Sequence, residues 1–303
     1  MNNSLAITAK KSLGLLESCS ICPRKCRVNR IRNNQGFCRT GLKPKVYSFM
    51  SHHGEEPPIS GTQGSGAIFF SGCNMSCVYC QNFKFSQEGE GREVDFSELA
   101  HFMLELQSAG CHNINLVTPT HVIPQILAAL NIAVSAGLKI PIIYNSSGYE
   151  LPQTIRMLEN IIGVYLVDMR YADAKISEKY SNAPDYPRYN QESVKEMHRQ
   201  VGVAEFNNND IIKKGLIIRH LVLPDNISGT EKIMKFIAEE VSTETYISLM
   251  SQYTPYYKAG KMNKISQRIT LKEYEEAKEI MNSFGLYNGW TQDSYGLEHL
   301  AGV

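Results

Sequence analysis

Apolar runs alternate with helical patterns along most of the chain. From Ala67 onward, short stretches rich in Ile, Val, Leu and aromatic residues are followed by segments whose apolar residues recur at helical spacing. This alternation is typical of parallel βα units. The predicted strands are 68–71, 114–118, 140–144, 164–168, 216–221 and 246–250, and the predicted helices are 96–108, 123–135, 152–158, 193–201, 230–240 and 271–284. The repeats predict an α/β fold, a partial (β/α)6 TIM-like barrel.

The rest of the chain divides into two shorter parts. Residues 1–45 contain four cysteines, and the stretch 19–41 that carries them has few apolar residues, so residues 1–45 are predicted to form a small Cys-rich metal-binding module. Residues 46–66, with several glycines near their end, are predicted to be a linker into the barrel domain at 67–303. A single barrel of this size is ordinary, since such domains often exceed roughly 200 residues.

Charge is balanced over the whole chain but not within the Cys-rich part. Lys and Arg number 31 and Asp and Glu 30, so the net charge of +1 gives no global field for nucleic acids or acidic membranes. A nucleic-acid module would also need aromatic partners, and only Phe37 is present. We interpret the local cations as offsetting a negative metal–thiolate centre, with any excess facing an acidic partner. Between Cys19 and Lys45 the charged residues are Arg24, Lys25, Arg27, Arg30, Arg32, Arg39, Lys43 and Lys45.

No segment predicts a secreted or membrane-spanning protein. The first residues lack the continuous apolar run of a signal peptide, and no stretch of roughly 18 apolar residues is long enough to cross a bilayer. The expected location is the cytoplasm. In that reducing compartment, clustered cysteines bind metals more often than they form disulfides.

The first cysteine motif supplies four thiols. Cys19, Cys22 and Cys26 form a CxxCxxxC run, and Cys38 follows it. Four thiolates complete the coordination of a structural zinc ion, and they equally suit a closed [4Fe-4S] cluster. The sequence therefore predicts a second metal site here and leaves zinc and iron–sulfur open.

The second cysteine motif, CxxxCxxC, follows the first predicted strand of the barrel. Cys73, Cys77 and Cys80 are close enough along the chain to ligate one metal centre. A four-iron cluster takes four ligands, so a loop that supplies three leaves one iron open. An open metal position marks a reactive site, as it does in catalytic zinc.

This loop, with Tyr79 just before its third cysteine, resembles the signature of the radical S-adenosylmethionine (SAM) enzymes. The resemblance implies that the three cysteines bind a [4Fe-4S] cluster whose free iron is chelated by the amino and carboxylate groups of SAM. It also implies reductive cleavage of SAM to methionine and a 5′-deoxyadenosyl radical, which removes hydrogen from a substrate. Tyr79 is then expected near the adenine. A structural zinc loop is the alternative.

Polar residues follow the predicted strands, at the end where barrel enzymes build their sites. In the radical SAM activating enzymes, which this chain also resembles, a GGE-type turn after the second strand binds the amino group of SAM. This chain has Thr118-Pro119-Thr120-His121 there, so backbone carbonyls and threonine hydroxyls are the expected substitutes for that contact. Asp168 and Arg170 face SAM or the substrate, or they pair with each other. The candidates for SAM binding are Thr118, Thr120, Asn145, Ser147, Asp168 and Arg219.

Three further residues carry alternatives. Arg219 and His220 are neighbours on a strand, so their side chains face opposite ways, and the carboxylate of SAM is one anionic partner for Arg219. His220 is predicted to be a packing residue, with substrate contact as the alternative. Cys111 is predicted to be a small buried residue, with a thiyl-forming role as the alternative. The loop residues Glu55 and Glu56 are predicted to be solvated, with contact to the cluster region or the substrate as the alternative.

Two other stretches resemble a narrower group. Glu55-Glu56-Pro57-Pro58-Ile59-Ser60-Gly61 and Arg219-His220-Leu221-Val222-Leu223-Pro224 resemble the PflX-like homologues of the pyruvate formate-lyase activating enzyme. The resemblance implies an oxidoreductase that abstracts hydrogen from a protein glycine. The alternatives are a small-molecule or peptide substrate, and a non-catalytic zinc or iron–sulfur protein. An electron donor such as flavodoxin or ferredoxin is the expected partner.

Overall fold

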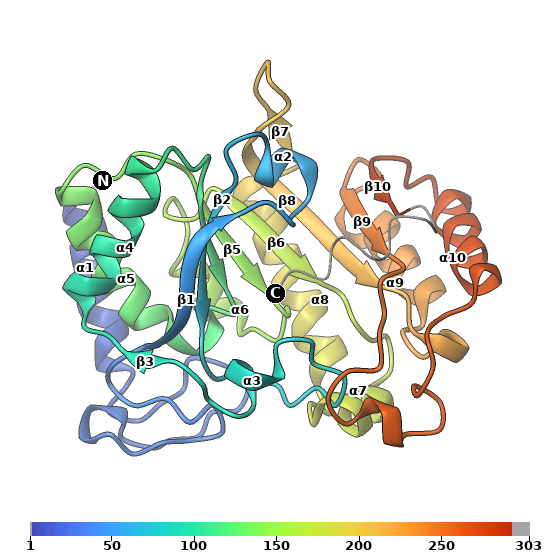
Figure 1. The fold of residues 1–303 in the computed structure, drawn as a ribbon, viewed down its shortest axis with the longest axis horizontal. Coiled ribbons are helices and arrows are strands. Elements are labelled where there is room, and N and C mark those ends of the chain that lie inside the picture. The colour runs from blue at the N-terminus through green and yellow to red at the C-terminus, as the bar shows by residue number, and fades with distance from the viewer. Residues whose placement is uncertain (1, 293–303) are drawn as a thin grey trace.

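A sheet of ten strands is the framework of the molecule (Figure 1). The computed structural model describes residues 2–292, with side chains from residue 4 on. In this part of the chain the strand order is β10-β9-β8-β6-β5-β4-β2-β1-β3, and β7 also pairs with β8. The strands are β1 Lys45–His52, β2 Ser65–Phe70, β3 Arg92–Glu93, β4 Ile114–Val117, β5 Ile142–Ser146, β6 Val164–Asp168, β7 Glu205–Phe206, β8 Ile212–Leu221, β9 Tyr246–Met250 and β10 Gly289–Thr291.

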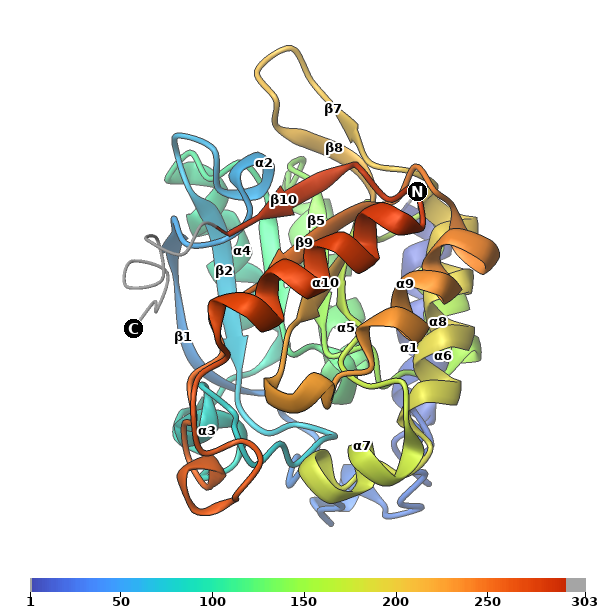
Figure 2. The same cartoon turned by 90° about the vertical axis from the view of Figure 1, so that its right-hand side faces the viewer.

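Seven of these strands run parallel, from β2 through β4, β5, β6, β8 and β9 to β10. Helices connect most of them, and α1, α4 and α5 stand at one end of the curved sheet while α9 and α10 stand at the other (Figure 1, Figure 2). The helices are α1 Asn2–Gly14, α2 Pro57–Ser60, α3 Phe83–Ser86, α4 Phe96–Ser108, α5 Ile123–Ser135, α6 Pro152–Arg156, α7 Ala174–Ser181, α8 Tyr186–Val201, α9 Thr230–Phe236 and α10 Leu271–Ser283. A π-helical turn, Ile237–Val241, extends α9.

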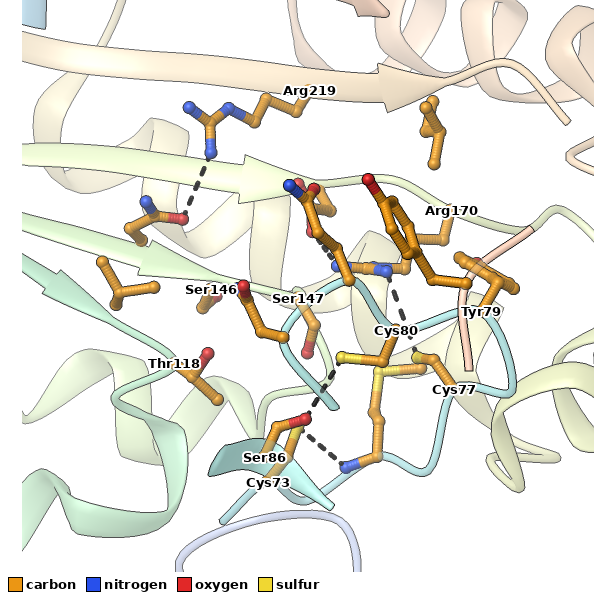
Figure 3. Close-up of a pocket in the computed structure, with 18 of the residues that line it drawn as sticks. Cys73, Cys77, Tyr79, Cys80, Ser86, Thr118, Ser146, Ser147, Arg170 and Arg219 are labelled. Atoms are coloured by element: carbon orange, nitrogen blue, oxygen red, sulfur yellow. Dashed lines mark hydrogen bonds and ion pairs between the residues drawn. The ribbon is translucent and has the colours of Figure 1, made fainter. Parts of the chain in front are cut away.

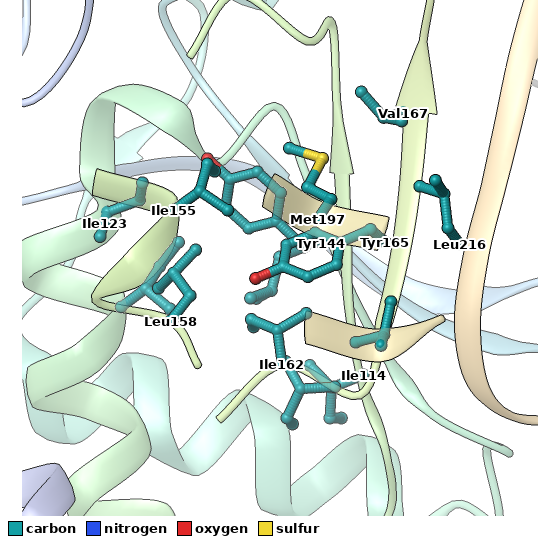
Figure 4. Close-up of a cluster of buried hydrophobic side chains, with 14 of the residues drawn as sticks. Ile114, Ile123, Tyr144, Ile155, Leu158, Ile162, Tyr165, Val167, Met197 and Leu216 are labelled. Atoms are coloured by element: carbon teal, nitrogen blue, oxygen red, sulfur yellow. The ribbon is translucent and has the colours of Figure 1, made fainter. Parts of the chain in front are cut away.

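Alternation along each strand separates two apolar layers. Tyr144 and Tyr165 face outward and pack with Leu158 and other residues of the helical layer (Figure 4). Their strand neighbours Ile143 and Leu166 face the inside of the barrel and form a smaller cluster there. Because side chains alternate faces along a strand, the next inward positions toward the carboxyl ends lie above this inner cluster. Those positions form the candidate site.

The six predicted strands and six predicted helices are all present, which confirms the α/β fold with a mostly parallel sheet. The predicted limits of 164–168 and 246–250 coincide with β6 and β9, and those of 96–108 and 123–135 with α4 and α5. The predicted helix at 193–201 is shorter than α8, which begins at Tyr186 behind a proline in its first turn.

The region expected to be a linker is ordered instead. Its first residues form β1, which pairs antiparallel with β2 and so covers the edge of the parallel sheet. Farther along, α2 places Ile59 in the inner apolar cluster, fully buried. Residues 46–66 are therefore part of the barrel.

Two elements at the ends of the chain have no counterpart among the predictions. Helix α1 buries Leu5 and Ala9 in the large outer core and packs against α5. Strand β10 extends the parallel sheet beyond β9 and carries Trp290. Residues 293–303 of the predicted barrel domain lie outside the described residues. No described helix has the length and apolar content that crossing a bilayer requires.

Candidate active site

A cavity of about 250 Å³ opens at the carboxyl ends of the parallel strands (Figure 3). Cys73, Cys77 and Cys80 line one side of it, on the loop that leaves β2. Polar side chains from the ends of four other strands line the rest: Thr118, Asn145, Ser146, Ser147, Asp168, Arg170 and Arg219. The structure thus brings three thiols and residues from five different strands into one space.

The cysteine loop is held close to the N-terminal part of the chain. Gly72 adopts φ +85°, and a Cβ at this position would lie 2.5 Å from the carbonyl oxygen of Cys38. Only glycine fits so close an approach at this backbone conformation. The turn that aims Cys73 into the cavity is therefore built against the Cys-rich segment.

Hydrogen-bond donors face all three thiols. The backbone N–H of Met75 donates to Cys73 Sγ at 3.3 Å, the Ser181 hydroxyl donates to Cys77 Sγ at 3.0 Å, and Ser86 Oγ lies 3.1 Å from Cys80 Sγ. Burial raises the pKa of Cys73 to about 12 and that of Cys80 to about 11. The thiols of Cys73 and Cys80 therefore stay protonated in the metal-free chain, and a bound metal would displace their protons.

Tyr79 lines the cavity at the head of a buried hydrogen-bond chain. Its hydroxyl lies 2.6 Å from that of Tyr171, which in turn lies 2.7 Å from Ser181 Oγ. Because Ser181 donates to Cys77, the consistent direction runs from Tyr79 through Tyr171 and Ser181 to the thiol. This series of hydrogen bonds joins Tyr79, expected near the adenine, to one of the three thiols of the loop.

A polar layer forms the floor of the cavity. Arg219 Nε donates to Glu56 Oε1 at 2.7 Å, and a second guanidinium nitrogen pairs with Glu55. Asn115 and Asn145 donate to Glu55 Oε1 at 2.9 and 3.4 Å. The carboxylates are 7% and 5% exposed, so the expectation that Glu55 and Glu56 are solvated is wrong.

Two carboxylates share one guanidinium in this layer. Burial alone would raise the pKa of Glu56, but the Arg219 guanidinium outweighs it and holds that pKa below its usual value. Arg219 therefore has two internal carboxylate partners and does not depend on SAM for one. Of the two alternatives for Asp168 and Arg170, the structure shows the mutual salt bridge.

Substitution of Arg219 by Met is expected to lower the free energy of unfolding by about 3–5 kcal/mol at pH 7, because two buried carboxylates lose their counter-ion. The measurement is urea denaturation without SAM. In the triple variant that adds Glu55→Gln and Glu56→Gln, most of the loss should be recovered. Arg188→Met, which breaks an exposed i,i+4 pair with Glu192, is the control and should change little. A stable Arg219→Met protein would contradict this role.

The sign of the pH dependence follows from the lowered pKa of Glu56. In the wild type, its stabilising effect is present above the unfolded pKa and is lost as pH falls through the folded value. In Arg219→Met the carboxylates are destabilising when ionised, so the deficit should shrink as pH falls toward 5.

The two candidate threonines in the turn after β4 point in different directions. Thr118 lines the cavity with φ +60°, a strained conformation for a β-branched residue. Thr120 points away from the cavity and donates to Glu150 Oε1 at 2.6 Å, so it does not contact SAM's expected position. Burial raises the pKa of Glu150 to about 7.

Two residues with open roles are packing residues. His220 is fully buried between the carbonyl of Met169 and the hydroxyl of Thr230, and burial lowers its pKa to about 4, so it is neutral. It faces away from Arg219, as strand alternation predicts. Cys111 is buried in the outer core, 3% exposed, and does not line the cavity.

The four N-terminal cysteines line a second, small cavity. Cys19, Cys22, Cys26 and Cys38 share it with Arg30, and Asn74 and His121 close it on the barrel side. All four are free thiols, and burial raises the pKa of Cys22 well above its usual value. No group of three His, Cys, Asp or Glu side chains among residues 4–292 is arranged to hold a single metal ion.

Comparison with known proteins supports the enzyme class that the cysteine loop and the barrel indicate. A model of the radical SAM superfamily matches residues 67–237. The chain therefore belongs to the radical SAM superfamily and is an enzyme of that class.

A curated relative is the uncharacterized protein MJ0674 of Methanocaldococcus jannaschii, 30% identical over 294 residues, which cover 94% of this chain and 80% of that protein.

Two solved structures share parts of the fold. SuiB of Streptococcus suis, bound to its precursor peptide SuiA, has 11% identity and a TM-score of 0.48 over 70% of this chain and 43% of SuiB. HydG, a maturase of the [FeFe]-hydrogenase, has 11% identity and a TM-score of 0.49 over 99% of this chain and 66% of HydG. At these values the likenesses indicate nothing about the reaction of this chain.

Proposed function

We propose that Cys73, Cys77 and Cys80 hold a [4Fe-4S] cluster and that the adjoining cavity binds SAM. The observation that carries this proposal is the placement of three thiols, spaced CxxxCxxC, in one cavity with polar side chains from the ends of four other strands. In this superfamily the bound cluster supplies one electron that splits SAM into methionine and a 5′-deoxyadenosyl radical. The roles of the chain's own residues follow from their positions.

The cavity lining is suited to a ligand with an amine, a carboxylate and a ribose. Asn145 and Ser147 offer amide and hydroxyl groups, and Thr118 adds a hydroxyl at the strained turn. Tyr79 presents its ring beside the cysteine loop, where an adenine can stack. The Asp168–Arg170 pair compensates its own charges, whereas Glu55 and Glu56 share the single cation Arg219. The neutral donors and acceptors of the lining are the groups that can orient SAM.

We assign the chain to the PflX-like group, with hydrogen abstraction from a protein glycine as its reaction. Support comes from the two stretches that carry the resemblance, because the first supplies Glu55 and Glu56 and the second supplies Arg219, and these three side chains pair. The shared motif is thus one structural unit at the floor of the cavity. Such an enzyme would act in the cytoplasm on a partner protein.

Two assays test the function. Anaerobically reconstituted protein with dithionite and SAM should release 5′-deoxyadenosine, and absence of that product would contradict the proposal. A partner protein labelled with α-deuterated glycine should then transfer deuterium to 5′-deoxyadenosine and show a glycyl radical by EPR. Deuterium that arrives only from labelled peptides or small molecules would replace the glycine assignment with one of those substrates.

We also propose a second metal centre, zinc or iron–sulfur, bound by Cys19, Cys22, Cys26 and Cys38. Arg30 supports it, because this side chain is 1% exposed, forms no ion pair in the described chain, and lies 3.8 Å from Cys19 Sγ. Its Nη2 atom has no hydrogen-bond partner. A buried cation requires an anion, and a metal bound to four thiolates supplies one.

Backbone strain around these cysteines points the same way. Lys25, Arg27 and Arg39 adopt positive φ angles of 43°, 59° and 55° without being glycines. Each such residue costs about 1 kcal/mol or more and persists where the surroundings hold it in place. A metal that fixes the neighbouring cysteines provides that restraint.

Substitution of Ser181 by Ala is expected to lower the reduction potential of the cluster by a few tens of millivolts, because a hydrogen bond to a ligating sulfur stabilises the reduced, more negative form. An EPR-monitored redox titration measures it. Ser177→Ala is the matched control, since this buried hydroxyl of the same helix bonds only backbone carbonyls, those of Ala174 and Ala183. Equal potentials in Ser181→Ala and wild type would remove Ser181 from the cluster's surroundings.

A further inference from the structure

We propose that the segment Cys19–Lys45 is the docking surface for an acidic one-electron carrier protein, and that electrons enter the enzyme there. This inference rests on the proposed second metal centre and commits it to iron–sulfur, because zinc has no redox chemistry in proteins. The inference specifies where the expected electron donor binds and that its binding surface is acidic.

The surface is cationic, and its charges form no ion pairs within the described chain. Of the eight basic residues in this segment, five are exposed, and none forms an ion pair within the described chain. No acidic residue occurs in the segment itself. Long-range attraction to a partner of opposite charge is the consequence. The five are Lys25, Arg27, Arg32, Arg39 and Lys43.

One of the four cysteines is partly exposed, and two of these cations flank it in the chain. Cys19, Cys22 and Cys38 are buried, whereas Cys26 is partly exposed. Lys25 and Arg27, its neighbours on either side, are both exposed. A carrier attracted to these cations would therefore sit against the part of the metal centre that is nearest to solvent.

The same cavity touches the radical SAM loop on its inner side. Asn74 lines it, and Arg24 Nε donates to the Asn74 carbonyl at 2.8 Å. On the other side of Cys73, Gly72 packs against the Cys38 carbonyl. Both chain neighbours of Cys73 thus contact the Cys-rich segment, which makes this the short route from surface to active site.

Electrons balance along this route. A reduced carrier would lose one electron to a centre held by Cys19, Cys22, Cys26 and Cys38, and a cluster held by Cys73, Cys77 and Cys80 would receive it. That electron would supply the reduction of the SAM sulfonium in which the carbon–sulfur bond breaks. One carrier is oxidised for each SAM cleaved, and no further oxidant or reductant is needed.

A basic surface also attracts nucleic acids, but two features favour the carrier. Phe37, the aromatic residue of the segment, stacks under Arg24 at 3.7 Å and is not free for a base. An iron–sulfur centre in the cysteine cavity would accept electrons from a carrier protein, whereas a nucleic acid has no electrons to deliver to it.

The test is the double charge reversal K25E/R27E in the reconstituted enzyme. Its affinity for a reduced flavodoxin of acidic surface, measured by calorimetry at several salt concentrations, should fall about tenfold or more with a shallower salt dependence. K213E/K214E reverses two exposed cations at the start of β8, at the opposite end of the barrel, and should bind as the wild type does (Figure 1). Equal affinity of K25E/R27E and the wild type would overturn the proposal.

Dithionite separates this inference from the proposed function. With dithionite as reductant, K25E/R27E should cleave SAM at the wild-type rate, whereas with flavodoxin it should be slower. Loss of cleavage in wild type with dithionite would refute the proposed function itself. Zinc in place of iron at the four cysteines, or tighter binding of a DNA oligonucleotide than of flavodoxin, would refute the docking inference alone.

Discussion

Substitution of Cys77 by Ala is expected to abolish SAM cleavage and to lower the iron content by one cluster. Cys77 lies at the end of the hydrogen-bond chain from Tyr79 and lines the cavity with the other two thiols. A four-iron cluster that already leaves one iron without a protein ligand would then have two such irons, and it is not retained. The measurements are 5′-deoxyadenosine release and iron per chain after anaerobic reconstitution.

Cys111→Ala is the matched control, because Cys111 is equally buried but lies in the outer core, away from the cavity. It should keep both its iron and its SAM cleavage, with a loss of stability of about 1 kcal/mol. If Cys77→Ala releases 5′-deoxyadenosine at the wild-type rate, Cys77 is not a cluster ligand.

Substitution of Cys22 by Ala is expected to remove the second metal centre and to destabilise the fold by about 3 kcal/mol or more. The physical reason is Arg30, which would stay buried without an anion. Metal analysis together with urea denaturation measures both effects. The cluster at Cys73, Cys77 and Cys80 should still assemble in the fraction that folds.

A second variant keeps this prediction testable if Cys22→Ala does not fold. Cys26→Ala changes the partly exposed cysteine, and its metal content should fall with a smaller cost in stability. Soluble Cys22→Ala protein with the metal content of the wild type would show that these four cysteines bind no metal.

The sequence predicts the barrel well because its signals are local. In β6 and β9, a run of apolar residues ends in polar ones at the carboxyl edge of the sheet, so both the strand and its end are visible in the sequence. The CxxxCxxC loop is equally local. Its three cysteines do line one cavity with Tyr79, Asn145 and Ser147.

What the sequence does not show depends on pairing between distant residues. Glu55 and Glu56 are far from Arg219 along the chain, so their ion pairs are invisible until the strands are placed. The alternation rule on β4, β5 and β8 was a usable signal, since it puts Asn115, Asn145 and Arg219 on the inside of the barrel. The burial of the glutamates follows once that polar layer is known.

Strand β1 shows a second limit. Its mixture of Ser, His and apolar residues has a weak strand signal, and its partner β2 supplies the missing part through an antiparallel ladder. Pairing with a neighbour, more than intrinsic preference, decides such segments.

The position of Arg30 bears on how the enzyme matures. Its guanidinium donates to the carbonyls of Gly41 and His121, so it ties the Cys-rich segment to the turn after β4. Without a metal, that tie would enclose a buried cation that has no ion-pair partner. If the four cysteines bind the proposed metal, its delivery would therefore precede the closure of this segment over the barrel.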